Sequence, residues 1–217
     1  MKDTTLGSRL MDLRKKRQMS MRDLAKRSGV STSFISQVET GKTNPTVAKL
    51  QNLATALGVP VNYFFDPHDD PPPSPEVSSH RVVSPPSSGG NGVPIHSGVP
   101  LDVVRSATRA VFELSHGVTW ARLTPHGRNG IEFLEVIYDV GADSGPLASH
   151  FGEEFVLVND GALEVRFPFD TVVLERGDSL VFDSTVPHTV RNVGQGPMRA
   201  LWVNWTGRNE NWTGSLH

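Results

Sequence analysis

Residues 20–39 read SMRDLAKRSGVSTSFISQVE, and two short helical patterns meet within this stretch at Gly29. Ser20, followed three residues later by Asp23, predicts a capped start for the first helix. Gly29 suits the left-handed backbone that ends a helix, and Ser31 is a typical cap for the next one. The stretch therefore predicts a helix-turn-helix, a motif whose second helix lies in the major groove of DNA.

The outward face of the second helix carries only short or flexible hydrogen-bonding side chains. These are Thr32, Ser33, Ser36 and Gln37, with no acidic residue among them. Such groups read base edges, whereas a carboxylate would repel the phosphates. Two short helices at a glycine turn can also be an ordinary helical corner, but this polar face favours a DNA-reading helix.

Further helical patterns flank this stretch on both sides. Residues 6–17 carry a leucine stripe and end in the basic run RKKR. Asn44 is expected to cap a later helix that begins at Pro45 and stops at Gly58. A last short segment at residues 61–65 supplies aromatic side chains that close the domain.

The run SxxDLAKxSGVSxSxISQVExGKxxPT resembles the lambda-repressor-like (XRE) family of bacterial and phage regulators, over residues 6–66. The resemblance implies a five-helix DNA-binding domain whose recognition helix reaches bases and whose following loop reaches phosphates. It also implies a structural pair between Arg14 and Glu39. The predicted DNA-binding residues are Arg22, Thr32, Ser33, Ser36, Gln37, Lys42 and Thr43.

The charge of the chain is divided unevenly along its length. Residues 1–66 hold 11 lysines and arginines against 5 acidic residues, and residues 67–217 hold 10 arginines against 18 acidic residues. Every lysine lies within the first 49 residues. A basic face can simply aid solubility, but its coincidence with the helix-turn-helix favours double-stranded DNA as a partner.

The composition also indicates in which cellular compartment the protein works. The 217 residues include no cysteine, which excludes disulfides and zinc–thiolate sites. No apolar run approaches the roughly 20 residues that a membrane span needs, and no signal-peptide pattern is present. The sequence therefore predicts a cytoplasmic protein without a membrane partner.

A proline-rich segment divides the chain. Residues 67–99 contain 8 of the 16 prolines and too few apolar residues to build a core. We expect a linker there, between a DNA-binding domain at residues 1–66 and a second domain at residues 100–207, followed by a tail at residues 208–217. Such a linker allows either loose tethering of the domains or packing through contacts that the sequence does not reveal.

From residue 100 onward the pattern changes to short strands. Valine, leucine and phenylalanine recur in brief runs that glycine, proline, asparagine and aspartate interrupt. No helical pattern separates them, and turn signals such as Asn159-Asp160-Gly161 fall where hairpins need them. The pattern predicts an antiparallel barrel or sandwich, so the chain is expected to be a two-domain α + β protein.

Two junctions in this region resemble the two motifs of the cupin superfamily. In order, they are Gly145-x4-His150-x3-Glu154-x6-Gly161 and Gly177-Asp178-x8-Pro187-His188-x3-Asn192. The resemblance implies a jelly-roll β-barrel. A lambda-repressor-like domain followed by a cupin is a known architecture of bacterial regulators, and it implies a barrel that senses an effector and supports dimerisation.

The first motif is incomplete, because Ala148 holds the place of its first histidine. His150, Glu154 and His188 remain, and this two-histidine, one-carboxylate set suits Fe(II), Mn(II), Ni(II) or Zn(II). The alternative is a metal-free pocket in which the same side chains bind an organic effector. The residues expected to line the pocket are Tyr138, Phe155, Phe182, Asn192, Trp202 and Asn204.

The sequence thus predicts a transcriptional regulator, not an enzyme, that binds a palindromic operator as a homodimer and responds to a small-molecule effector. The alternative is a mononuclear non-haem iron oxygenase. The hydroxypropylphosphonate epoxidases share a helix-turn-helix-like domain and the His-x3-Glu spacing of His150 and Glu154. That family places a lysine where this sequence has Gln18 and Met19. The basic domain, the polar recognition face and the long linker favour the regulator.

Overall fold

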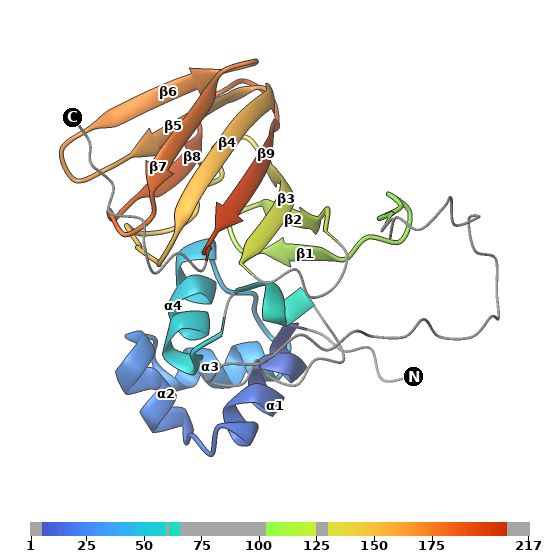
Figure 1. Ribbon diagram of the computed structural model, residues 1–217. Coiled ribbons are helices and arrows are strands. Elements are labelled where there is room, and N and C mark those ends of the chain that lie inside the picture. The colour runs from blue at the N-terminus through green and yellow to red at the C-terminus, as the bar shows by residue number, and fades with distance from the viewer. Residues whose placement is uncertain (1–5, 60, 66–102, 125–129, 208–217) are drawn as a thin grey trace.

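The computed structural model describes residues 6–59, 61–65, 103–124 and 130–207. Helices form the N-terminal part and strands the C-terminal part, so the predicted two-domain α + β fold is confirmed (Figure 1). The predicted linker, residues 67–99, and the predicted tail, residues 208–217, lie outside the described residues.

The helical part consists of α-helices and one 3-10 helix. They are α1 (Leu6–Lys16), α2 (Met21–Ser28), α3 (Thr32–Glu39), α4 (Val47–Leu57) and the 3-10 helix η1 (Val61–Phe65). Within the described ranges, no helix is both long enough and apolar enough to cross a membrane.

The helix-turn-helix begins and turns at the residues that the sequence predicts. The Ser20 hydroxyl accepts a hydrogen bond from the amide of Asp23, and the Asp23 carboxylate accepts one from the amide of Ser20, each at 3.1 Å. Gly29 ends α2 with φ of 69°, where a side chain would be strained. Ser31 caps α3 by accepting from the amide of Phe34 at 3.3 Å.

A buried ion pair joins α1 to α3. Arg14 Nε and Nη2 donate to the two carboxylate oxygens of Glu39 at 2.6 and 2.8 Å. Arg14 Nη1 also donates to the carbonyl of Met19 at 2.9 Å. The hydrogen bond with Glu39 raises the pKa of Arg14, and both side chains are buried. The pair therefore fixes the helix that precedes the motif against the recognition helix.

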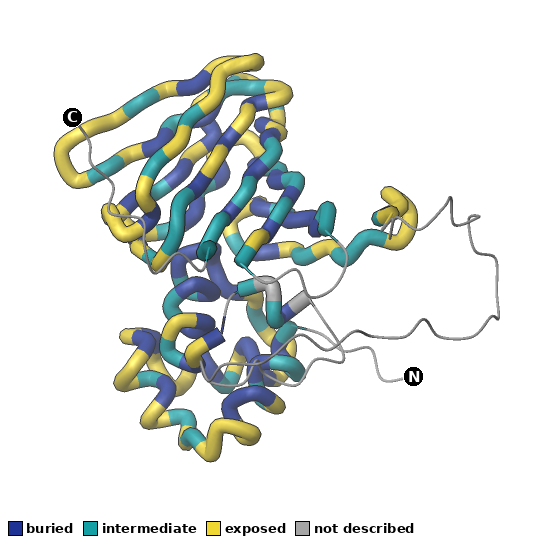
Figure 2. The backbone as a smooth tube through the Cα atoms, viewed as in Figure 1, coloured by how far each residue is buried: buried dark blue, intermediate teal, exposed yellow. Residues whose placement is uncertain are grey.

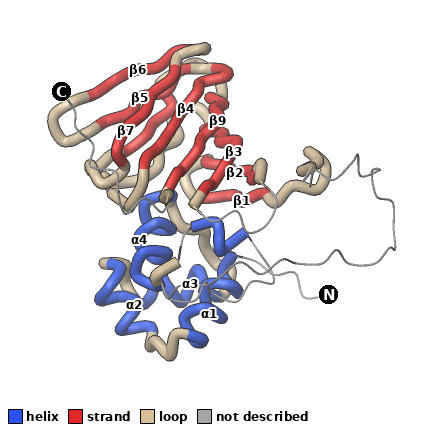
Figure 3. Tube along the Cα trace, viewed as in Figure 1, coloured by secondary structure: helices blue, strands red, loops and turns tan. Residues whose placement is uncertain are grey.

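The strands form two antiparallel sheets that pack as a barrel (Figure 3). The larger sheet has the order β1-β2-β3-β9-β4-β7, and the smaller has the order β6-β5-β8. The strands are β1 (Val111–Leu114), β2 (Val118–Arg122), β3 (Ile131–Tyr138), β4 (Glu153–Asp160), β5 (Ala162–Arg166), β6 (Thr171–Glu175), β7 (Ser179–Asp183), β8 (Thr189–Asn192) and β9 (Met198–Trp205).

Burial alternates along β3 and β9, where dark blue segments in Figure 2 mark the buried residues. Alternate side chains of these strands therefore point into the barrel. Most of these inward side chains are apolar, including Val136 and Trp202. At the end nearest α4 they become polar: the amide of Asn204 donates to the carboxylate of Glu132 at 3.0 Å, and both residues are buried. The barrel therefore has an apolar interior with a polar mouth.

The N-terminal end of helix α4 abuts this mouth (Figure 1), and its residues Val47, Ala48 and Gln51 line the cavity there. The amide of Ala48 donates to the carbonyl of Ser144 at 3.0 Å, and the amide of Ser115 donates to the carbonyl of Pro45 at 3.0 Å. The two domains are therefore packed against each other and not loosely tethered.

The same contacts explain why α4 begins later than predicted. Its cap is Thr46, whose hydroxyl accepts from the amide of Lys49 at 3.3 Å, rather than Asn44. Asn44 and Pro45 stay in the loop before the helix, because Ser115 binds the carbonyl oxygens of both.

Replacing Arg14 with alanine is expected to lower the free energy of unfolding by about 3–5 kcal/mol, because Glu39 would keep a buried charge without its partner. The double variant Arg14→Met/Glu39→Leu should be less destabilised, since it leaves no buried charge. Urea unfolding followed by circular dichroism measures both. A double variant that loses as much stability as the single one would contradict this explanation.

Candidate functional site

The residues predicted to bind DNA come from α2, from α3 and from the loop after α3. Arg22, Thr32, Ser33, Gln37 and Lys42 are exposed, and Ser36 and Thr43 are half-buried. The loop is attached to the recognition helix, because the amide of Lys42 donates to the carbonyl of Gln37 at 2.8 Å. One continuous segment, residues 32–43, thus carries most of the predicted DNA contacts.

The two acidic residues of the helix-turn-helix are both engaged within the fold. The hydroxyl and amide of Ser20 donate to the carboxylate of Asp23 at 2.6 and 3.1 Å, and these hydrogen bonds lower the pKa of Asp23. Glu39 is buried against Arg14. The exposed face of α3 is therefore left with neutral hydrogen-bonding groups that can approach a polyanion.

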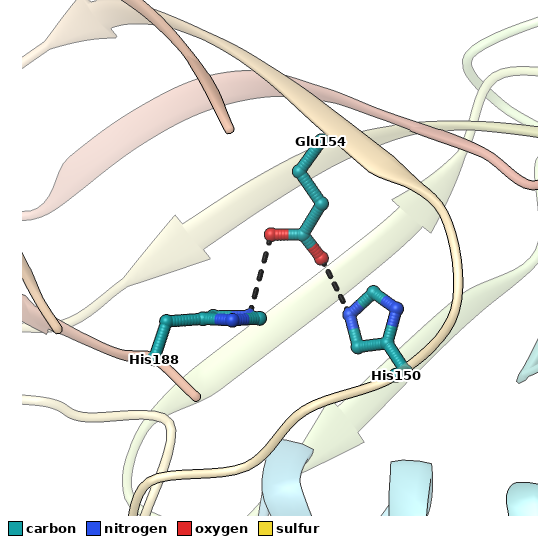
Figure 4. A group of neighbouring side chains, drawn as sticks. All are labelled: His150, Glu154 and His188. Carbon is teal, nitrogen blue, oxygen red and sulfur yellow. Dashed lines mark ion pairs between the residues drawn. The ribbon is translucent and has the colours of Figure 1, made fainter. Parts of the chain in front are cut away.

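A second constellation lies inside the barrel mouth. His150 precedes β4, Glu154 lies on β4, and His188 precedes β8 (Figure 4). His150 Nε2 is 2.7 Å from one carboxylate oxygen of Glu154, and His188 Nε2 is 3.4 Å from the other. One ligand atom from each residue lies within 4.8 Å of the others. We call this set the triad.

Backbone contacts orient both imidazole rings of the triad. His188 Nδ1 lies 2.9 Å from the carbonyl of Val186, and His150 Nδ1 lies 3.4 Å from the carbonyl of Phe151. A ring that donates through Nδ1 keeps Nε2 free as a lone-pair donor, which is the usual arrangement of a metal-binding histidine. A proton on His150 Nε2 is the alternative to a cation there, because this atom faces Glu154. Burial lowers the pKa of His150, but the hydrogen bond and charge of Glu154 outweigh burial and raise this pKa above its usual value.

The triad fits a divalent cation. Glu154 is 2% exposed, and its Oε2 has no hydrogen-bond partner among the described residues. A buried carboxylate oxygen without such a partner is costly unless a cation or a proton neutralises it. Ala148 adds only backbone bonds to His188, at 2.9 and 3.0 Å, so three protein ligands remain and other coordination positions stay open.

The cavity beside the triad is small. Its volume is about 20 Å³, room for roughly one water molecule. Both domains line it: Val47, Ala48 and Gln51 of α4 face Glu154 and His188 across it. Next to it lies a cleft of about 400 Å³ between α4, η1 and the barrel, which we call the interdomain cleft.

Four of the six residues predicted to line the pocket lie at or beside it. Tyr138, Trp202 and Asn204 line the cavity, and the ring of Phe182 packs edge-on against His188 with centroids 4.8 Å apart. The prediction for Phe155 was wrong, because strand alternation turns it outward beside the inward-facing Glu154.

The prediction for Asn192 was also wrong. Its side-chain amide donates to the carbonyls of Tyr138, Asp139 and Gly196 at 2.9–3.0 Å, so it holds turns together and does not line the cavity.

Sequence reasoning missed several lining residues, among them Gln51 and Glu132. The signal for Gln51 was available: α4 is apolar at Val47, Ala48 and Ala54 as well as at its leucines. A helix that is apolar on more than one face is buried on more than one face.

Comparison with known proteins matches both domains. Residues 10–64 match the helix-turn-helix family model, and residues 134–204 match the cupin domain model. The HTH-type transcriptional regulator PuuR of Escherichia coli (strain K12) is 24% identical over 196 residues, which cover 90% of this chain and 91% of PuuR. SutR, another HTH-type transcriptional regulator of the same organism, is 27% identical over 190 residues, 88% of each chain.

A relative that matches only the helical domain, and a solved structure, are also named as transcriptional regulators. The HTH-type transcriptional regulator y4dJ of Sinorhizobium fredii is 37% identical over 67 residues, which cover 87% of y4dJ and 31% of this chain. The crystal structure of an HTH_3 family transcriptional regulator from Vibrio cholerae superposes with a TM-score of 0.63 at 21% identity. That match covers 94% of this chain and 96% of the other, so the two proteins share the fold of both domains.

Replacing Glu154 with glutamine is expected to lower the affinity for Zn(II) or Co(II) by more than about tenfold, because the triad loses its anionic ligand. Glu153→Gln, one residue earlier on β4, is the control and should bind as the wild type does. Isothermal titration of chelator-treated protein measures the affinity. Equal affinities in the two variants would show that Glu154 is not a ligand.

Proposed function

Because this chain belongs to the helix-turn-helix transcriptional regulators that carry a C-terminal cupin domain, we propose that a ligand in its cupin domain modulates its operator binding. The observation that carries the DNA-binding part is the exposed, acid-free face of α3, presented in a basic domain. Regulators named as such match this chain over about nine-tenths of its length.

The residues on this face have separate roles in the proposal. Thr32, Ser33, Ser36 and Gln37 read base edges, since their short polar side chains carry both donors and acceptors. Arg22, Lys42 and Thr43 contact phosphates, which position the domain without reading sequence. The partner is double-stranded DNA in the cytoplasm.

We propose a homodimer on a palindromic operator, because one recognition helix covers only a half-site. The outer face of the larger sheet offers a contact surface for a second copy. Phe155, Leu157 and Val181 are exposed there at 38%, 40% and 56%, and Phe155 lies directly opposite Val181. Neighbouring exposed apolar side chains of this kind favour self-association through the same patch on each copy.

In the cupin domain we propose a divalent metal at the triad, with an organic effector nearby. The metal would be held by His150, Glu154 and His188 and would supply open coordination positions. The chain's own contribution is to orient both imidazoles through the carbonyls of Phe151 and Val186 and to keep the carboxylate buried.

We propose that the protein is not an enzyme. The named relatives are transcriptional regulators, and this chain keeps a polar DNA-reading face that an oxygenase would not need. The length of the linker does not distinguish a regulator from an oxygenase, because α4 of the helical domain lines the cupin cavity. Oxygen uptake by Fe(II)-loaded protein with candidate substrates would overturn this part of the proposal.

Selection of bound sites from random double-stranded DNA tests the proposal as a whole. It is carried out with and without a panel of metabolites and with and without divalent metal. We expect enrichment of a two-fold symmetric DNA site. We also expect the amount of this DNA that is bound to change when one of the metabolites or the metal is added. No enriched sequence at low salt would remove the regulator proposal.

Replacing Gln37 with alanine is expected to lower operator affinity by about 10–100-fold and to relax preference at one base position in each half-site. Gln195→Ala, an exposed glutamine in the cupin domain, is the control. Fluorescence anisotropy with the selected operator and with single-base variants measures both effects. Unchanged discrimination among these sites would remove Gln37 from the base-reading residues.

Replacing Lys42 with alanine is expected to weaken binding to operator and unrelated DNA alike, because a phosphate contact carries no sequence information. The slope of log affinity against log salt should fall by about 1. Arg176→Ala, an exposed basic residue of the cupin domain, should leave the slope unchanged. A loss confined to the operator would instead assign Lys42 to base reading.

A further inference from the structure

Helix α4 belongs to two cores at once. Leu50 and Leu53 are fully buried among the helices of the DNA-binding domain. Val47, Ala48 and Gln51 lie on its other side and line the cupin cavity, where none of them is more than 7% exposed. The helix cannot shift relative to the barrel without changing the position of the domain that holds α3.

The first turn of α4 completes its hydrogen bonds in the cupin domain. An amide in the first turn of a helix has no acceptor within the helix. Here the amide of Ala48 donates to the carbonyl of Ser144. The residues just before the helix are held in the same way, because Ser115 binds the carbonyls of Asn44 and Pro45.

The approach of the two domains is close enough to require a glycine. A Cβ added at Gly145 would lie 2.9 Å from the hydroxyl of Thr46 and 3.6 Å from the Cβ of Ala48. Gly145 also has φ of +96°, which favours glycine for a second reason. The contact between loop 144–145 and the start of α4 is therefore tightly fitted.

The space for an effector lies between the domains and not in the barrel. A cavity of about 20 Å³ has no room for a metabolite, whereas the interdomain cleft of about 400 Å³ matches the size of small-molecule sites. Gln51 and Asn204 line both spaces, and His150 of the triad lines the cleft. The cleft thus opens directly onto the triad.

The lining of the cleft defines the kind of molecule that it accepts. Its polar end is formed by Gln51, Glu132, His150 and Asn204, and Asn204 Oδ1 is buried without a hydrogen-bond partner among the described residues. The rest is largely apolar and includes Val59, Val61 and Phe151. A small organic molecule with a hydrogen-bonding head and a short apolar body fits this distribution.

We propose that the interdomain cleft is the effector site and that α4 transmits its occupancy to the DNA-binding loop. This inference rests on the proposed function. A molecule in the cleft touches α4 and the barrel together, so it binds the docked arrangement better than an undocked one. Docking in turn fixes Asn44 and Pro45, which directly follow Lys42 and Thr43 of the predicted phosphate-binding loop.

One experiment separates docking from backbone strain. Gly145→Ala adds a methyl group against Thr46, whereas Gly177→Ala adds one at nearly the same backbone angle, φ +93°, with nothing within 4 Å. Both variants place an alanine at a similar positive φ, but only the first brings its methyl group against the start of α4. Amide hydrogen exchange of residues 44–51 and affinity for the selected operator are measured in the full chain.

We expect Gly145→Ala to speed exchange at residues 44–51 and to lower operator affinity by about fivefold or more, the usual range of coupling between sites. Gly177→Ala should match the wild type in both. Should Gly145→Ala fail to fold, Ala48→Leu enlarges the helix side of the contact with little loss of helix propensity. Faster exchange with unchanged affinity would overturn the coupling, and unchanged exchange in both variants would overturn the docking.

A tethered occupant tests the cleft itself. The chain has no cysteine, so Thr55→Cys places a single thiol on the exposed rim of the cleft, and Asn52→Cys places one elsewhere on α4. Each is modified with benzyl methanethiosulfonate. We expect slower exchange of α4 and altered operator affinity only when the benzyl group is at residue 55, and equal behaviour of the two adducts would rule out the cleft.

These outcomes are distinguishable from failure of the proposed function. If the wild-type chain shows no salt-sensitive binding to any duplex, the regulator proposal fails, while the exchange data still report on docking and on occupancy of the cleft.

Discussion

The structure depends on one constraint, which is that α4 buries two faces in two different domains. Its leucines complete the core of the helix-turn-helix domain, while Val47, Ala48 and Gln51 cover the mouth of the barrel. Apolar burial alone would leave the relative orientation loosely defined, since it is not directional. The hydrogen bond from the amide of Ala48 to the carbonyl of Ser144 and the close fit at Gly145 define the relative orientation of the two domains.

The triad illustrates how the same chain departs from a complete cupin site and still presents three converging ligands. Glu154 lies between two imidazoles whose orientation is set by backbone carbonyls. The geometry of the triad therefore does not depend on a fourth side chain. Ala148 places no side-chain ligand on that side of the site and contributes a backbone bridge to His188. An incomplete motif is therefore compatible with an ordered site.

Much of the helical domain could be predicted from residues that are close together in the sequence. The caps at Ser20 and Ser31 and the turn at Gly29 follow from neighbouring residues. The resemblance to the two cupin motifs implied that His150, Glu154 and His188 converge. Errors arose where the answer depends on distant parts of the chain. Phe155 was misplaced because the inward phase of β4 is set by its pairing with β7 and β9. Asn44 was misassigned as a cap because Ser115, far away in sequence, engages its carbonyl.

The shared helix also limits how freely the two domains can be exchanged during evolution. Removed from its barrel, the helical domain would expose Val47 and the Gln51 side of α4 and leave the amide of Ala48 without its protein acceptor. Recombination with a different sensor would thus require the surface of α4 to be rebuilt first. The pair is consequently expected to be inherited as one folding unit, in spite of its two distinct architectures.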